Sequence, residues 1–256
     1  MGILNVTPDS FSDGGKFNTL DAALRHTEQM IADGASIIDV GGESTKPGYT
    51  PVPADIQIER VVPVIEKIKA NFDIPVSVDT TDAMVAKASI DAGCDLINDI
   101  WGLKKDRNLA KVVADSGLPV VLMHNRENTE YKLFFNELIS DLKESVRIAE
   151  AAGIGLDKII LDPGIGFAKD VDQNLEAINK LEKIRELGYP VLLGTSRKSV
   201  IGKTLDLPVD ERLEGTLATT VIGVMKGCGI IRVHDVKENI RAVKMAEAIL
   251  NANGHY

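Results

Sequence analysis

Short apolar runs recur along the chain, and each ends in a polar residue that can take part in chemistry. A parallel β-strand is buried on both faces, so it reads as a continuous apolar run rather than as an alternation. The polar residue therefore marks the place where the strand leaves the core. The eight runs are Leu4–Asn5, Ile37–Asp39, Val76–Asp79, Leu96–Asn98, Val120–His124, Ile159–Asp162, Val191–Thr195 and Ile230–Arg232.

Segments with helical spacing of apolar residues separate these runs, and a glycine suited to ending a helix precedes several of the strands. We expect helices near 19–33, 54–70, 81–92, 107–116, 131–152, 171–187, 210–226 and 235–251. This alternation predicts an α/β protein, a single (β/α)8 TIM barrel over residues 1–256, and 256 residues is close to the usual size of about 250. In such a barrel the site lies where the C-terminal ends of the strands meet.

The charge balance narrows the range of partners. Lys and Arg number 29 against 38 Asp and Glu, a net charge of −9, which argues against a broad nucleic-acid-binding face. No apolar run approaches the roughly 18 residues of a membrane span, and the chain opens without a signal-peptide pattern, so we expect a cytoplasmic protein with no membrane partner. Cys94 and Cys228 lack metal-spaced partners and are expected to be reduced packing residues.

Three strand ends carry a combination of two carboxylates and one amide. Asp79, Asn98 and Asp162 could together accept hydrogen bonds from a ligand with several adjacent N–H donors, such as an aminopyrimidine-like heterocycle. The alternative is that Asp79 and Asp162 cap the helices that follow them. Their joint occurrence at strand ends favours a pocket.

The last two strands are followed by cationic residues. The segment Thr195–Ser199 could bind a phosphate through its side chains and backbone N–H groups, and Lys198 could instead form a Schiff base. Arg197 is expected to be a solvated surface cation. Arg232 and His234 alternate along the chain and, together with Asn5, could hold an anion with a hard cation.

Two further residues could be functional or structural. Phe167 lies in a glycine-rich segment after the sixth strand, where it could cover the core or pack against a flat substrate. His124 is expected to be structural, because a lone histidine is more often a hydrogen-bonding core residue than a ligand.

Seven longer motifs occur in order along the chain, and together they are far more specific than any one of them. In this order they closely resemble the dihydropteroate synthase family over essentially the whole chain. The motifs are Gly2–Gly15, Asp39–Gly48, Ser77–Thr80, Ile97–Asp99, Leu161–Phe167, Thr195–Ser199 and Arg232–His234.

The resemblance implies a reaction in which 6-hydroxymethyl-7,8-dihydropterin diphosphate and p-aminobenzoate give 7,8-dihydropteroate and diphosphate, in folate biosynthesis. It also implies Mg²⁺, competition by sulfonamides, and a homodimer. Roles carried over from the family are pterin binding for Asp79, Asn98, Met123, Asp162, Lys198 and Arg232; diphosphate binding for Asn5, Arg232 and His234, with Asn5 as a metal ligand; p-aminobenzoate binding for Thr45, Pro47, Phe167 and Ser199; and catalysis by Lys198, Asp13, Lys46 and Arg232, of which Asp13 and Lys46 belong to loops that close over the site.

Such a site would favour an SN1-like displacement, because it stabilises both the departing diphosphate and the positive charge on the pterin methylene without a protein nucleophile. Two features depart from the family pattern. Lys46 stands where the family usually has Arg, which removes a planar fork for bidentate binding. The chain also lacks the usual leading β-hairpin.

Three other functions remain open from the residues. A methyltetrahydrofolate-dependent methyltransferase would share the carboxylate-and-amide pocket but would not need Lys198, Arg232 and His234 for a diphosphate. A Schiff-base aldolase would use Lys198 as its nucleophile. A non-catalytic pterin-binding protein would keep the pocket without turnover.

Overall fold

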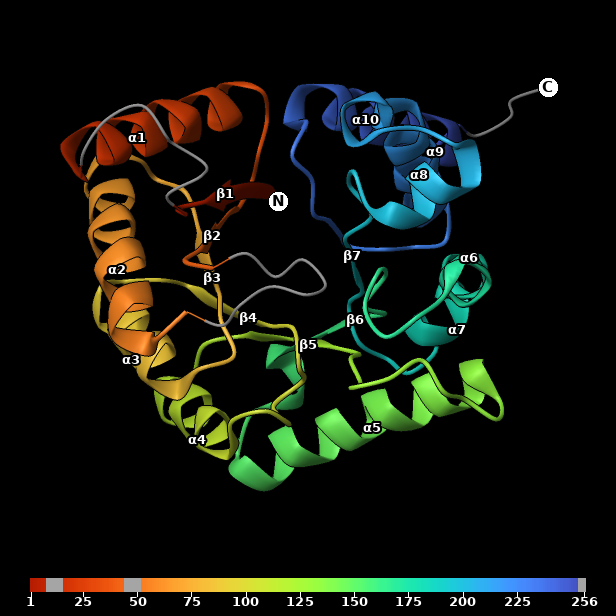
Figure 1. The fold of residues 1–256 in the computed structure, drawn as a ribbon, viewed down its shortest axis with the longest axis horizontal. Helices are drawn as coiled ribbons and strands as arrows, with labels where there is room; N and C mark the ends of the chain where they lie inside the picture. The colour runs from red at the N-terminus through yellow and green to blue at the C-terminus, as the bar shows by residue number, and fades with distance from the viewer. Residues whose placement is uncertain (8–15, 44–51, 253–256) are drawn as a thin grey trace.

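The computed structural model describes residues 1–7, 16–43 and 52–252 (Figure 1). Its strands are short and follow the apolar runs. They are β1 (Gly2–Asn5), β2 (Ile38–Gly41), β3 (Val76–Asp79), β4 (Leu96–Asp99), β5 (Val120–Met123), β6 (Ile159–Asp162), β7 (Leu192–Leu193) and β8 (Ile230–Ile231). The helices between and after them are α1 (Lys16–Ala32), α2 (Ala54–Asn71), α3 (Ala83–Asp91), α4 (Arg107–Ser116), α5 (Phe134–Ala152), α6 (Val171–Asn179), α7 (Leu181–Arg185), α8 (Ser199–Leu205), α9 (Leu213–Met225) and α10 (Val236–Leu250).

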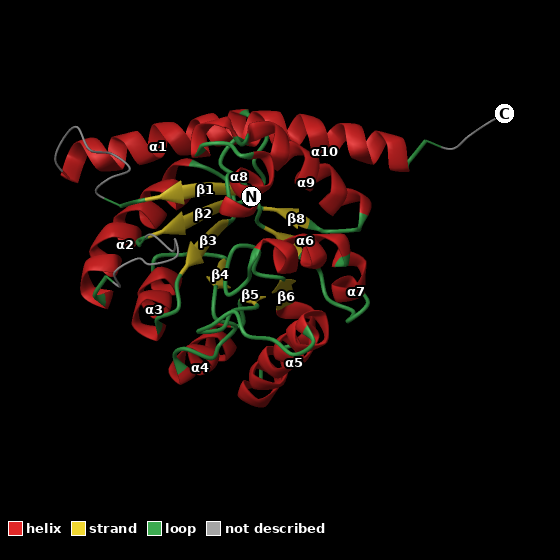
Figure 2. Ribbon diagram, turned by 45° about the vertical axis from the view of Figure 1, so that its right-hand side comes forward, coloured by secondary structure: helices red, strands yellow, loops and turns green. Residues whose placement is uncertain are grey.

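The eight strands form a closed, parallel barrel. Strands β1 to β6 pair in chain order, and β7 pairs with β8. Single parallel bridges join these two groups, one between Leu161 and Val191 and the other between Gly2 and Val233. The helices surround the strands on the outside (Figures 1 and 2). The predicted (β/α)8 barrel is therefore confirmed, with its weakest pairing on both sides of the β7–β8 pair.

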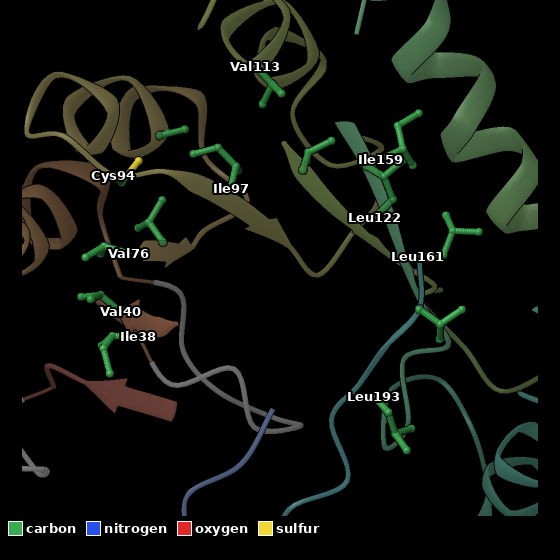
Figure 3. Packing of buried hydrophobic residues seen from close by; sticks show 14 of the residues in the cluster. Ile38, Val40, Val76, Cys94, Ile97, Val113, Leu122, Ile159, Leu161 and Leu193 are labelled. Atoms are coloured by element: carbon green, nitrogen blue, oxygen red, sulfur yellow. The ribbon is translucent and has the colours of Figure 1, made fainter. Parts of the chain in front are cut away.

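Apolar side chains from successive strands and helices pack into one large core. Figure 3 shows part of it, including Ile97, Leu122 and Ile159, all of which are fully buried. Cys94 is buried in this core, Cys228 packs against its edge, and neither forms a disulfide. None of the helices in the described part of the chain is long and apolar enough to cross a membrane.

Two of the expected helices differ from the structure. The segment expected as one helix over 171–187 is two helices, because Lys180 leaves the helical conformation between α6 and α7. The helix expected from 210 begins at Leu213, after a short 3₁₀ turn over Val209–Glu211. Helix α8 was not expected, since its seven residues are too few to show a period.

A core substitution should measure how much the barrel depends on this packing. Leu122 is fully buried, so Leu122→Ala is expected to lower the free energy of unfolding by about 2–5 kcal/mol through lost contacts and the cavity left behind. Urea unfolding measures the change. Leu133→Ala, at a side chain that is 65% exposed, is the control and should change stability by no more than about 0.5 kcal/mol.

Candidate functional site

The ends of β3, β4 and β6 bring together the three acceptors predicted from the sequence. Asp79 and Asn98 are register partners on adjacent strands, and Asp162 pairs with Met123 on the next pair of strands. All four side chains are buried. Neither carboxylate caps a helix, because the N-cap of α3 is Asp82 and the N-cap of α6 is Asp170. The helix-cap alternative is therefore wrong.

One guanidinium joins two buried carboxylates across the barrel. Arg232 Nε donates to Asp39 Oδ2 at 2.6 Å, and Arg232 Nη2 donates to Asp79 Oδ2 at 2.9 Å. Asn98 Nδ2 donates to the same Asp39 oxygen at 3.2 Å. Asp39 is fully buried within β2, so its charge requires this pairing.

Sequence reasoning gave Asp39 no role. The apolar run predicts a strand that ends at Asp39, whereas β2 continues to Gly41 and places Asp39 inside the barrel. A carboxylate within an otherwise apolar run was the signal that could have identified it.

Two carboxylate oxygens at this site lack a hydrogen-bond partner within the described part of the chain. These are Asp39 Oδ1 and Asp79 Oδ1, and both are buried. An unpaired buried acceptor costs roughly 1–3 kcal/mol, so such groups are usually satisfied by a ligand or by water. The geometry therefore suits a ligand that presents N–H donors.

Burial shifts the pKa values of the site in a consistent way. It raises the pKa of Asp79 to about 7, with Arg232 acting in the opposite direction and Asp39 reinforcing the rise. It likewise raises the pKa of Asp162, although the charge of Lys198 opposes this. Burial lowers the pKa of Lys198 to about 8, with Asp162 acting to raise it. One carboxyl group of the cluster is thus able to hold a proton near neutral pH.

Lys198 and Phe167 lie against each other beside this cluster. The Lys198 ammonium donates to the carbonyl of Ile165 and sits 4.8 Å from the centre of the Phe167 ring. Ser199 follows directly as the first residue of α8. Lys198 and Phe167 are therefore in contact, and Ser199 adjoins Lys198 in the chain.

The predicted anion site is only partly assembled. His234 Nδ1 lies 3.0 Å from Ser196 Oγ, and the His234 backbone N–H donates to the same hydroxyl at 3.2 Å. Arg232 is held by the two carboxylates described above rather than standing free for an anion. Arg197 is exposed, as expected, but forms a bidentate ion pair with Asp235.

The structure offers few protein ligands for a metal ion. In residues 1–7, 16–43 and 52–252 no three His, Cys, Asp or Glu side chains are grouped for metal binding. Asn5 ends β1 with its amide oxygen near Gly41. A single amide oxygen fits Mg²⁺ only where a substrate phosphate and water supply the other oxygens, which is a common arrangement for this ion.

Four predicted residues lie outside the described residues. They are Asp13, Thr45, Lys46 and Pro47.

Comparison with known proteins agrees with the motifs and with the barrel. The pterin binding enzyme family matches residues 1–234. A dihydropteroate synthase of Clostridium beijerinckii is 62% identical over 251 residues, which is 98% of this chain and 93% of that protein. The chain belongs to the dihydropteroate synthase family.

Solved structures of the family share the fold closely. The dihydropteroate synthase of Clostridium difficile, solved in the presence of pteroic acid, superposes with a TM-score of 0.96 at 50% identity, over 98% of this chain and 96% of that one. The Yersinia pestis dihydropteroate synthase, in a sulfonamide drug complex, gives a TM-score of 0.92 at 42% identity, over 99% and 94%. Membership of the family makes this protein a transferase of folate biosynthesis.

The raised pKa of Asp79 predicts how stability depends on pH. The folded state holds this proton more tightly than the unfolded state, so the free energy of unfolding should fall as pH rises from about 4 to about 7. One proton contributes a slope of at most about 1.4 kcal/mol per pH unit.

Asp79→Asn should remove this contribution, because the amide does not titrate. Urea unfolding of the wild type and of Asp79→Asn between pH 4 and pH 8 isolates the contribution of Asp79. Asp162 and the other buried carboxyl groups are common to the two proteins. Parallel pH curves for the wild type and the variant would contradict the assignment.

Proposed function

We propose that the pocket at the ends of β3, β4 and β6 binds the pterin of 6-hydroxymethyl-7,8-dihydropterin diphosphate, and that p-aminobenzoate binds beside Phe167 and Ser199. The observation that carries this proposal is the pair of buried, unpartnered carboxylate oxygens of Asp39 and Asp79 next to Asn98. The exocyclic amine and ring N–H groups of a pterin supply the donors that these oxygens lack.

Each rim residue then has a physical task. Asp79, Asn98 and Asp162 accept hydrogen bonds, and the two carboxylates place negative charge near the ring, which stabilises positive charge on the methylene as diphosphate leaves. The charge of Arg232 opposes the rise in the pKa of Asp79, and the charge of Lys198 opposes the rise in the pKa of Asp162, so both cations favour the ionised carboxylates. Met123, buried at the end of β5, supplies apolar contact to the ring.

The leaving group would depart towards Asn5 and His234. Asn5 would hold Mg²⁺ jointly with the diphosphate oxygens, and the ion would neutralise charge on the leaving group. The carbon–oxygen bond to the diphosphate breaks, the arylamine nitrogen forms the new bond to the methylene carbon and then releases a proton to water, so no protein nucleophile is needed. We also propose the roles that the family resemblance implies for four further residues. These are loops that close over the site for Asp13 and Lys46, and p-aminobenzoate binding for Thr45 and Pro47.

The aldolase alternative is not favoured by the surroundings of Lys198. Its ammonium donates to the Ile165 carbonyl and lies over the Phe167 ring, both of which stabilise the charged form. With a pKa of about 8 the side chain is mainly protonated at neutral pH, whereas Schiff-base formation needs the free amine.

We further propose that the protein is a homodimer that pairs through α9 and α10. Large apolar side chains are exposed on these two neighbouring helices, namely Ile222, Met225, Met245 and Ile249. Burial of such a patch is typical of a subunit interface. Competition by sulfonamides and a cytoplasmic location likewise remain predictions.

The function is tested by incubating the purified protein with the pterin diphosphate, p-aminobenzoate and Mg²⁺. Dihydropteroate and diphosphate are expected in equal amounts, measured by chromatography and by a phosphate assay after pyrophosphatase treatment. Binding of the pterin without either product would instead indicate a non-catalytic pterin-binding protein.

Asp162→Asn tests the pterin pocket directly. Loss of a charge-assisted hydrogen bond should raise the dissociation constant for the pterin roughly 10- to 100-fold by calorimetry. Asp172→Asn, on the exposed side of the first turn of α6, is the matched control and should bind as the wild type does. Equal affinities for the two variants would remove Asp162 from the pocket.

A further inference from the structure

A second lysine, Lys169, lies behind the loop that carries Phe167. Its side chain is almost completely buried. Its ammonium makes three contacts, with the carbonyls of Gly164 and Phe167 at 2.9 and 3.0 Å and with His124 Nδ1 at 2.8 Å. An ammonium has three N–H donors, so all of them are used.

The orientation of His124 follows from this contact. An ammonium can only donate, so Nδ1 must accept, and the imidazole proton then lies on Nε2. That nitrogen is 3.1 Å from Asp141 Oδ2, where it donates. Burial and the neighbouring Lys169 charge lower the pKa of His124 to about 4, although Asp141 acts to raise it, so the ring stays neutral.

The chain of contacts continues to the protein surface. Arg126 forms a bidentate ion pair with Asp141 and contacts Glu137 at 2.9 Å. Burial acts to raise the pKa of Asp141, but hydrogen bonds from His124 and Arg126 bring it well below its usual range. Asp141 is therefore a fixed negative charge that holds the imidazole in one orientation.

Two other side chains also hold this loop: Tyr131 Oη donates to the Ala168 carbonyl at 2.8 Å, and Asn174 Oδ1 accepts from the Gly166 N–H at 2.6 Å. Gly164 and Ala168 both have positive φ angles, of 66° and 45°. A Cβ atom on Gly164 would lie only 1.9 Å from the His124 carbonyl oxygen, so the loop and the His124 backbone are in close contact. Lys198 donates to the carbonyl of the next residue, Ile165. The buried Lys169 and the partly buried Lys198 thus hold three carbonyls of one short segment, those of Gly164, Ile165 and Phe167.

We propose that Lys169 and His124 are positioning residues for p-aminobenzoate binding, which hold the 164–168 loop so that the Phe167 ring and Lys198 are in place before the substrate arrives. Neither residue contacts the substrate. A rigid loop loses less entropy on binding. Loosening the loop should therefore weaken the binding of p-aminobenzoate and leave the binding of the pterin unchanged. The proposal rests on the proposed function through its assignment of Phe167.

Two substitutions of His124 separate positioning from general damage. His124→Asn keeps an acceptor at the position of Nδ1 but loses the contact with Asp141. His124→Gln reaches towards Asp141 but leaves Lys169 without that acceptor. Both remove the ring, so they should destabilise the protein to a similar extent. His124→Gln is expected to raise KM for p-aminobenzoate about tenfold, the effect of losing one hydrogen bond to a charged group, and His124→Asn much less.

Lys169→Met tests the lysine itself, with the exposed Lys111→Met as its control. The variant should raise KM for p-aminobenzoate about tenfold, while the dissociation constant for the pterin stays within about twofold.

The pH dependence of KM for p-aminobenzoate, compared between the wild type and Lys169→Met, provides a second readout. Burial lowers the pKa of Lys169 to about 7, with Asp162 and Asp141 acting to raise it and Lys198 and Arg126 reinforcing the fall. KM of the wild type should therefore rise above that pH more steeply than KM of Lys169→Met, which retains every other titratable group facing this site, including the neutral His124.

Amide hydrogen exchange tests the proposal without any substrate. The N–H groups of Gly164, Gly166 and Phe167 donate to Asp162 Oδ1, to Asn174 Oδ1 and to the Gly164 carbonyl, so their exchange rates report the order of the loop. Exchange should accelerate in Lys169→Met and His124→Gln but not in His124→Asn.

Equal exchange and equal KM in the two His124 variants would overturn the proposal, even if Lys169→Met failed to fold. Loss of pterin affinity equal to the loss for p-aminobenzoate would overturn it as well. A wild type that makes no dihydropteroate would instead refute the proposed function, and the exchange rates would still decide whether the pair holds the loop.

Discussion

The sharing of one guanidinium between two buried carboxylates connects the fold of this protein to its site. Arg232 follows β8, whereas Asp39 and Asp79 come from β2 and β3. The interaction therefore joins the last strand of the barrel to strands near the start of the chain. Backbone pairing is weakest in the same region, where single bridges link β7 and β8 to their neighbours. The ion pairs therefore support closure at the place where the hydrogen-bond ladder gives least support, and removing either partner would leave an uncompensated buried charge.

The same cluster is expensive to maintain. Three carboxyl groups, Asp39, Asp79 and Asp162, are buried around two cations, Arg232 and Lys198, and two carboxylate oxygens have no partner among the described residues. Burial raises the pKa of Asp79 and Asp162, so the ionised form of each is less stable in the folded protein than in water. Groups held in such an unfavourable state are typical of a binding site, because a ligand with N–H donors relieves the cost when it binds.

The sequence predicted the barrel and most of the rim because buried parallel strands leave a direct trace, an apolar run with a polar end. It could not reveal Asp39 as a partner of Arg232, since the two residues are 193 positions apart and meet only when the barrel closes. Lys169 was missed for a related reason. A lysine next to a helix start reads as a surface residue, and its burial depends on the loop folding back over His124. The break between α6 and α7 was missed because both parts keep the same helical spacing.

Two lysines that donate to carbonyls of one loop have different relations to the proposed reaction. Lys198 lies over the Phe167 ring and its charge acts on Asp162 within the pocket, whereas Lys169 holds the backbone carbonyls behind that ring. Burial lowers the pKa of both ammonium groups, to about 7 for Lys169 and to about 8 for Lys198, and the charge of Asp162 acts against this fall in each case. Removing the charge of Lys198 should therefore alter the chemistry at the pterin. Removing the charge of Lys169 should alter only how well the loop is ordered. The two lysines share the same loop and the same neighbouring Asp162. Their different roles therefore follow only from the different atoms that each ammonium contacts.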